Sequence, residues 1–329
     1  MTLTLPLFAS AVLVTGLMGV SPATATTTEH GRAARPLQPA AEAVPERGDI
    51  VEHVVAGGVA GRNGVLDYWT PRRMAAAAPI DLLGAAAKVL GAPGTPVHQR
   101  SPRIGGARWG AGGSVTRTTG RVFLTVGGLD FVCSASSVKS ANKDLVVTAG
   151  HCVKDGTGAW ADNWTFVPGY DAGRQPYGQF TARRMFVTGP WSRSADDSYD
   201  VGMVALNPGA GKHVADVVGG QDIAFGGARG RPAHTFGFPA ESPYDGEHLV
   251  YCAGPVRADP HDQTGDQGMH CDMTAGSSGG PWLSSFDTPT GRGTITSVSS
   301  FKYSDDRSTM YGPYFGTTVK ELYTTAERS

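Results

Sequence analysis

Two short segments, far apart in the chain, carry residue types that could perform acyl transfer. Thr148–Cys152 contains His151, and Gly276–Pro281 holds Ser278 among three glycines. A glycine-rich turn lets the backbone bend sharply and present N–H groups beside a serine hydroxyl. An acyl-transfer enzyme needs a nucleophile and an anion-binding hole in one loop, so the two segments favour a serine hydrolase.

His151 is the candidate base, and Asp200 is the candidate group that orients it. A serine hydroxyl is a poor nucleophile at neutral pH, so it needs a base, whose tautomer a third group must fix. His151 follows an apolar predicted strand, and Asp200 leads directly into the apolar run 201–206. Asp196 and Asp197 are the alternatives to Asp200, but both lie in the polar loop before that run.

Ser278 is the candidate nucleophile, in preference to the adjacent Ser277, because Ser278 immediately precedes two glycines and a proline. The backbone N–H groups of Gly276 and Ser278 are the expected oxyanion hole. A glycine-rich linker is the alternative interpretation of the segment. A linker would not need the flanking Cys271 or the apolar Trp282 beyond the turn.

The four cysteines predict two disulfides, because an even number in an exported chain favours pairing. Four cysteines allow three connectivities of two bonds each. We expect the connectivity in which each bond closes a loop of about 20 residues. A metal site is the alternative, since His151 and His270 each precede a cysteine, but no C-x-x-C spacing occurs and we expect no metal. The expected disulfides are Cys133–Cys152 and Cys252–Cys271.

Composition favours β structure and excludes some classes of partner. Glycine accounts for 46 of 329 residues and charged residues for 17%, which indicates many turns and few charged helical faces. The formal net charge of −1 gives no basic field for nucleic acid and no acidic field for a basic partner.

Residues 1–25 resemble an export signal, with an apolar run from Leu3 to Val20 and a possible cleavage site at Ala23–Ala25. One feature departs from such signals, since no Lys or Arg precedes Arg32. A retained membrane anchor is the alternative. No other stretch is long and apolar enough to span a bilayer, so we expect a secreted protein without membrane association once the signal is removed.

Residues 26–103 differ in composition from the rest, being rich in Ala, Pro and Arg and without cysteine. We interpret them as a largely flexible pro-segment. Short ordered elements are expected at Leu66–Pro71 and Ile80–Leu90, and two aromatic residues there are candidates for docking onto the mature domain. A solvated linker is the alternative.

Residues 104–329 form the expected catalytic domain. Short β-prone runs alternate there with Gly, Pro, Asn and Asp, and this pattern is typical of a barrel or sandwich. A short helix is expected only at the end, over Val319–Ala326. The predicted strands are 122–126, 129–135, 145–148, 201–206, 233–238, 249–252 and 294–301.

The order His151, Asp200, Ser278, with these surroundings, resembles the chymotrypsin-like (trypsin-like) serine endopeptidases. The run Cys271–Gly279 and the segment Phe236–Pro239 are closer to the secreted bacterial branch related to glutamyl endopeptidases. The resemblance covers roughly residues 104–326. It implies an all-β fold of two antiparallel six-stranded barrels with the site between them, protein or peptide substrates, a monomer and no cofactor.

The resemblance also has departures. Trypsin-like zymogens carry an aspartate before the nucleophile, and it pairs with the new N-terminus after cleavage; here that position is Ser277. Arg103–Gly106 still resembles a trypsin-type activation site. We therefore hypothesise that removal of the leader unblocks the cleft rather than building the oxyanion hole.

The resemblance places Asp272 where trypsin-like members have the acid at the base of the primary pocket, which would favour Arg or Lys. The same acid can be structural in the bacterial branch. Ser299 and Met273 stand where glutamate-specific members have a histidine and a threonine, which argues against glutamate specificity. Alignment with the family's last strands assigns the pocket to Asp272, Ser300, Phe301 and Gly312.

Two alternative functions remain at this stage. One is a glutamyl endopeptidase of the same fold. The other is a non-catalytic protease homologue that acts as a binding protein, although such proteins normally lack a member of the triad and all three are present here.

Overall fold

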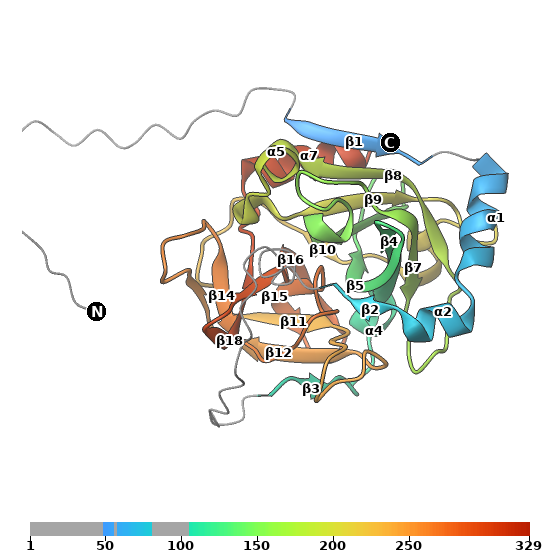
Figure 1. The fold of residues 1–329 in the computed structure, drawn as a ribbon. Coiled ribbons are helices and arrows are strands. Elements are labelled where there is room, and N and C mark those ends of the chain that lie inside the picture. The colour runs from blue at the N-terminus through green and yellow to red at the C-terminus, as the bar shows by residue number, and fades with distance from the viewer. Residues whose placement is uncertain (1–48, 56–57, 81–104) are drawn as a thin grey trace, which may run out of the picture. The chain divides into compact units, whose positions relative to one another are not determined.

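The computed structural model describes residues 49–55, 58–80 and 105–329 (Figure 1). The predicted export signal at 1–25, nearly all of the expected element at 80–90 and the Arg103 processing site lie outside these residues. Within the described ranges, no helix has the length and apolar character that crossing a membrane requires.

The first half of the expected catalytic domain is a closed, antiparallel six-stranded barrel, as predicted. Each strand pairs with the next in the order β4-β5-β6-β9-β8-β7, and β7 pairs back with β4. Alternate residues of β4 enter different apolar clusters, Val122 and Leu124 one and Phe123 the other, which is the period of two expected of a strand. The strands are β4 (Thr119–Val126), β5 (Leu129–Ser137), β6 (Leu145–Thr148), β7 (Asp162–Pro168), β8 (Phe180–Thr188) and β9 (Gly202–Leu206).

The second half consists of two sheets around a common core. The first has the order β10-β16-β15-β11-β12-β3, and the second has the order β13-β14-β18-β17. Trp282 from the first sheet and Met269 and Met310 from the second lie in one buried cluster. The strands are β3 (Ala107–Arg108), β10 (Asp222–Ile223), β11 (Ala233–Gly237), β12 (Val250–Gly254), β13 (Val256–Ala258), β14 (Gln267–His270), β15 (Pro281–Asp287), β16 (Arg292–Val298), β17 (Phe301–Tyr303) and β18 (Asp306–Gly312).

Helices are short, and α7 (Thr317–Ala326) is the helix predicted at the end of the chain. It buries Val319, Leu322 and Ala326, which lie three, four and seven residues apart on one helical face. The other helices of the catalytic domain are α4 (Ser114–Thr118), α5 (Gly189–Ser194) and α6 (Val214–Val218), with single 3-10 turns η1 (Gly150–Cys152) and η2 (Asp197–Tyr199).

The described part of the predicted pro-segment is ordered and packs on the first barrel. Strand β1 (Ile50–Val54) pairs with β8, and β2 (Ala78–Pro79) pairs with β5. Between them lie α1 (Gly58–Tyr68) and α2 (Pro71–Ala76). Backbone pairing at both ends and the burial of Trp69 hold residues 49–55 and 58–80 on the barrel, and the rest of the segment for which flexibility was expected lies outside the described residues.

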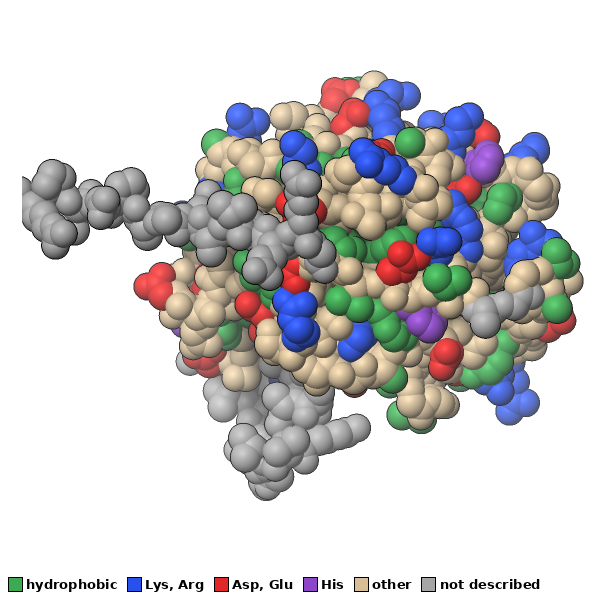
Figure 2. Space-filling model, turned by 90° about the horizontal axis from the view of Figure 1, so that it is seen from above, with side chains coloured by type: hydrophobic (Ala, Val, Ile, Leu, Met, Phe, Trp, Pro, Cys, Tyr) green, Lys and Arg blue, Asp and Glu red, His purple; other side chains and the backbone are tan. Residues whose placement is uncertain are grey.

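Both predicted disulfides are present, with Cα–Cα distances of 6.2 Å for Cys133–Cys152 and 5.7 Å for Cys252–Cys271. The surface matches the near-zero net charge, because side chains of both signs are interspersed on the face in Figure 2.

Candidate active site

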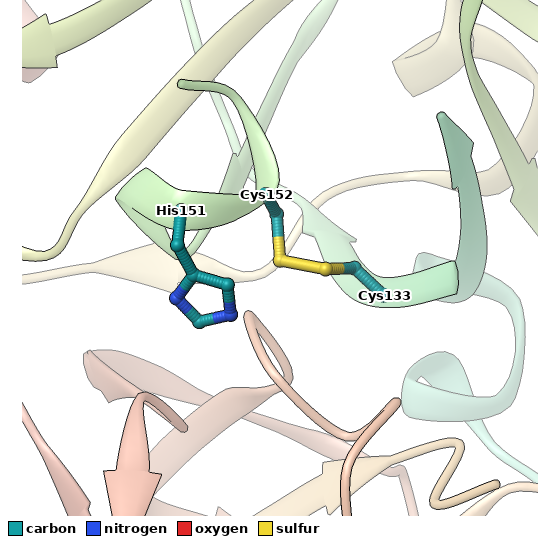
Figure 3. Close-up of side chains that lie close together, drawn as sticks. All are labelled: Cys133, His151 and Cys152. Carbon is teal, nitrogen blue, oxygen red and sulfur yellow. A yellow bond between two sulfur atoms is a disulfide. The ribbon is translucent and has the colours of Figure 1, made fainter. Parts of the chain in front are cut away.

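His151 lies in η1, the 3-10 turn directly after β6, and its side chain is buried. The neighbouring Cys152 is joined to Cys133 on β5, so the turn is fixed to the barrel wall beside the imidazole (Figure 3). Two hydrogen bonds orient the residue: its backbone N–H donates to Asp200 Oδ1 at 2.7 Å, and its Nδ1 lies 2.8 Å from Asp200 Oδ2.

Asp200 is fully buried between η2 and β9. Its carboxylate also accepts a hydrogen bond from the Ser300 hydroxyl, which brings to three the donors that offset the cost of burying a charge. Asp196 and Asp197, the alternatives to Asp200, do not hydrogen-bond His151 among the described residues. Asp196 instead caps η2.

With Nδ1 facing a carboxylate, the neutral ring carries its proton on Nδ1 and leaves Nε2 as an acceptor. Within the described residues, Nε2 is buried and has no hydrogen-bond partner. The bond from Ser278 to Nε2 that general-base catalysis requires is therefore not formed in this state. Such bonds often tighten only when substrate is bound.

Ser278 lies in the loop between β14 and β15, and glycines shape that loop. Gly276 and Gly279 have φ of +94° and +80°, a region that favours glycine. A Cβ at Gly279 would also clash with the Thr148 side chain and the Ser134 carbonyl. The Ser278 carbonyl accepts from Ser134 N at 2.8 Å, so the loop is held against β5 of the first barrel.

The N–H groups of this loop divide into two sets. Those of Ser277, Gly279 and Gly280 donate to backbone carbonyls. Those of Gly276 and Ser278, the expected oxyanion hole, donate to no backbone carbonyl in the part of the chain that the structure describes. These two N–H groups, one on each side of Ser277, are available to hydrogen-bond a developing anion.

A cavity of about 290 Å³ opens beside Ser278. Asp272, Ser300 and Phe301, three of the expected pocket residues, line it, but Gly312 does not, because it pairs with Gln267 between β14 and β18. The complete lining is Ile80, Glu241, Asp272, Met273, Thr274, Ala275, Ser277, Ser278, Ser300, Phe301, Lys302, Arg307 and Met310.

Asp272 is held by the protein itself. Its Oδ1 accepts from Tyr244 Oη at 2.5 Å and from the backbone N–H of Gly106 at 2.6 Å. Burial, together with this hydrogen bond to Asp272, raises the pKa of Tyr244, which therefore stays a donor. The geometry matches the structural role that the bacterial branch allows for this acid.

Sequence reasoning missed the two cations that line the cavity, Lys302 and Arg307. Lys302 Nζ donates to the carbonyls of Cys271 at 2.6 Å and Arg307 at 2.7 Å. Burial lowers its pKa to about 8, against the opposing effect of the Asp272 and Asp306 charges. Lys302 could have been found from its position in the sequence, because it follows the expected pocket residue Ser300 by two residues and lies on β17.

A group of acids lies behind Asp200. Burial, with the charges of Asp200 and Asp197 nearby, raises the pKa of Asp266 to about 8. Burial and the Asp200 charge likewise raise the pKa of Asp197 to about 6. Asp200 therefore has neighbours that are partly or wholly protonated at neutral pH.

One group of residues in the described part has the spacing of metal ligands, namely Cys133, His151 and Cys152. The two sulfurs are bonded to each other (Figure 3), so neither is the thiolate that would bind a metal ion.

Two solved structures that are similar to this chain over nearly their whole length are described as proteases. The protease Anisep of Arthrobacter nicotinovorans is 43% identical, with a TM-score of 0.63 over 65% of this chain and 96% of its own. The thermostable serine protease AL20 from an extremophilic microorganism is 36% identical, with a TM-score of 0.62 over 66% of this chain and 99% of its own. The chain belongs to the chymotrypsin-like serine proteases of bacteria.

Other comparisons add less about this protease. A Glu endopeptidase structure shares the fold at 17% identity and a TM-score of 0.52. Among curated proteins, an extracellular metalloprotease of Bacillus subtilis is 37% identical over 73 residues, which is 22% of this chain and 23% of that protein. No protein-family model matches the sequence.

Proposed function

We propose that the protease hydrolyses internal peptide bonds through an acyl-enzyme, with Ser278 as nucleophile, His151 as base and Asp200 as the orienting carboxylate. One observation carries the proposal. The His151 ring is fixed by the 2.8 Å contact between Nδ1 and Asp200 Oδ2, and its Nε2 is left unpaired in the described site that also contains Ser278.

Each step has a residue to perform it. His151 Nε2 takes the Ser278 proton as Oγ bonds to the substrate carbonyl carbon, and the N–H groups of Gly276 and Ser278 hold the oxyanion. The imidazolium then protonates the leaving amine and the C–N bond breaks. Water, deprotonated by His151, attacks the acyl-enzyme, and the proton returns to Oγ.

We also propose how the chain is exported and processed. Residues 1–25 direct export, residues 26–103 are removed, and residues 104–329 act outside the cell as a monomer on proteins or peptides. The two disulfides support this, since such bonds persist in oxidising compartments.

A narrower alternative, cleavage after glutamate, is favoured by one observation. Lys302 and Arg307 line the cavity, although Asp272 and Glu241 line it too. Cleavage of a random peptide library separates the two possibilities. Dominant cleavage after Glu that falls selectively in Lys302→Met supports the narrower function, whereas an unchanged profile rejects a role for Lys302.

Ser278→Ala and Ser277→Ala form a matched pair that tests the assignment. We expect Ser278→Ala to lower kcat/KM by more than about a thousandfold, because the nucleophile is lost. Ser277→Ala loses only a hydrogen bond from its hydroxyl to the Thr274 carbonyl and should retain activity within about tenfold. Full activity in Ser278→Ala would reject the assignment.

A further inference from the structure

The segment 58–80, which we call the blocking segment, leads from the surface into the candidate active site. Its last strand, β2, pairs in parallel with Phe131 and Val132 of β5. The backbone N–H of Ile80 continues this pairing, donating to the Val132 carbonyl at 3.3 Å. Ile80 then lines the same cavity as Ser278, so part of the pro-segment borders the site directly.

The blocking segment is anchored before it reaches the site. Trp69 is 2% exposed, and its indole N–H donates to the Asn163 carbonyl at 2.5 Å. Tyr68 Oη donates to Asp130 at 2.6 Å, and the Arg73 guanidinium contacts the same carboxylate at 3.2 Å. These contacts place α1 and α2 at the side of the barrel, where Figure 1 shows them, and fix the entry of β2.

The direction of β2 differs from that of a substrate. His151 must protonate the leaving amine, so the leaving-group side of the site is the side of the His151 turn, which is tied through Cys152 to Cys133. Phe131 and Val132 directly precede Cys133 and therefore lie on that side. A substrate would run from the cavity toward this side, whereas the blocking segment runs from Ala78 beside β5 toward Ile80 at the cavity wall.

We propose that the blocking segment is an intramolecular inhibitor that occupies the leaving-group side of the cleft in reverse. It covers the β5 edge at Val132 and adds Ile80 to the wall of the cavity, so a substrate cannot pair with that edge or pass through the space that Ile80 takes. Because its direction is reversed, its own peptide bonds do not present a leaving amine to His151, and the segment is not cleaved where it binds. This inference rests on the proposed function, which defines the leaving-group side of the cleft.

Cutting the chain between Ile80 and Gly105 would then convert the inhibitor into a separate ligand. Release of that ligand exposes the edge of β5 to a substrate running in the productive direction. The surface that fits the blocking segment therefore fits an extended peptide with an aliphatic side chain at the edge of the cavity, where Ile80 packs against the apolar cluster of the first barrel.

Binding can be measured apart from catalysis in the full chain carrying Ser278→Ala, which cannot process itself if the proposed function holds. We expect adding Ile80→Asp to lower the Kd for fluorescein-labelled casein by about tenfold or more, because the fraction of open site rises. Trp69→Ala, which removes the anchor, should act in the same direction. Val59→Asp is the matched control, since Val59 is 66% exposed in the same segment and should leave Kd unchanged.

Equal Kd values for Ile80→Asp, Trp69→Ala and the parent chain would overturn the inference, provided that circular dichroism shows each to be folded. The proposed function fails on a different result, namely no hydrolysis by any chain with Ser278 intact. If casein binding rises in these variants but no chain with Ser278 intact hydrolyses casein, the blocking role of the segment is supported and the proposed enzymatic function is rejected.

Discussion

The Ser300 hydroxyl hydrogen-bonds the carboxylate that orients His151, so it acts on the reaction through Asp200. We expect Ser300→Ala to lower kcat by about tenfold to a hundredfold, because a hydrogen bond to a charged group contributes about 1.5–3 kcal/mol. KM should change little if the role is positioning. Steady-state kinetics on a peptide substrate measures both.

Ser194→Ala is the control for this variant, because Ser194 is on α5 and, among the described residues, its hydroxyl bonds only the Pro190 carbonyl. A rise in KM with unchanged kcat in Ser300→Ala would instead assign Ser300 to the substrate cavity that it also lines.

Asp266 makes stability depend on pH. Its side chain is buried, and neither carboxylate oxygen has a hydrogen-bond partner among the described residues. Its pKa rises from 3.8 in the unfolded chain to about 8 in the fold. The unfolded chain therefore loses this proton first as pH rises, and the stabilising contribution, complete below about pH 4, is lost by about pH 8.

Asp266→Asn removes this titration. We expect wild type to lose stability relative to the variant, on the order of a few kcal/mol, between about pH 4 and pH 8. Urea unfolding at a series of pH values, with Ser278→Ala in both chains to prevent autolysis, measures the difference. A difference in unfolding free energy that is constant with pH would show that Asp266 is not protonated in the fold.

At the scale of elements, the Cys133–Cys152 disulfide joins β5 to the turn that carries His151. We expect Cys133→Ala/Cys152→Ala to lower the free energy of unfolding by about 3 kcal/mol, because the loop closed by the bond spans 19 residues. Activity should fall as well, since the turn loses its tether. Urea denaturation and activity assays of this double variant, alongside Cys252→Ala/Cys271→Ala, separate the two effects.

The second pair closes a loop of the same 19-residue separation in the other half and does not join the His151 turn, so it controls for the loss of a disulfide without the loss of that tether. If both double variants lost equal activity, the tether would have no specific part in placing His151.

Elements with clean apolar runs could be predicted from sequence, and β6 and α7 are examples. Strand β8 could not, because Arg183 and Arg184 interrupt its pattern; both long side chains reach the surface, where they meet Ser329 and Glu52. The motifs around His151, Asp200 and Ser278 are each local in the sequence, so these three residues could be predicted as candidates. The cations of the cavity were not, since Lys302 and Arg307 meet only when β17 pairs with β18.

For the molecule as a whole, composition did not predict the packing of the described segment that precedes the expected catalytic domain. Its average composition is that of a flexible leader, and this hides a few anchoring residues such as Trp69 and Met74, both buried. Docking depends on surfaces supplied by β5, β7 and β8, which composition cannot reveal. The aromatic pair Tyr68 and Trp69 was the one local signal.

In the proposed mechanism, Ser278 is the activated nucleophile. The most direct measurement is to treat the enzyme, freed of its pro-segment, with an organophosphorus fluoridate and to locate the adduct by mass spectrometry. We predict one adduct, on Ser278, with labelling abolished in His151→Ala and unchanged in Ser277→Ala. An adduct on another residue, or no labelling of Ser278, would contradict the account.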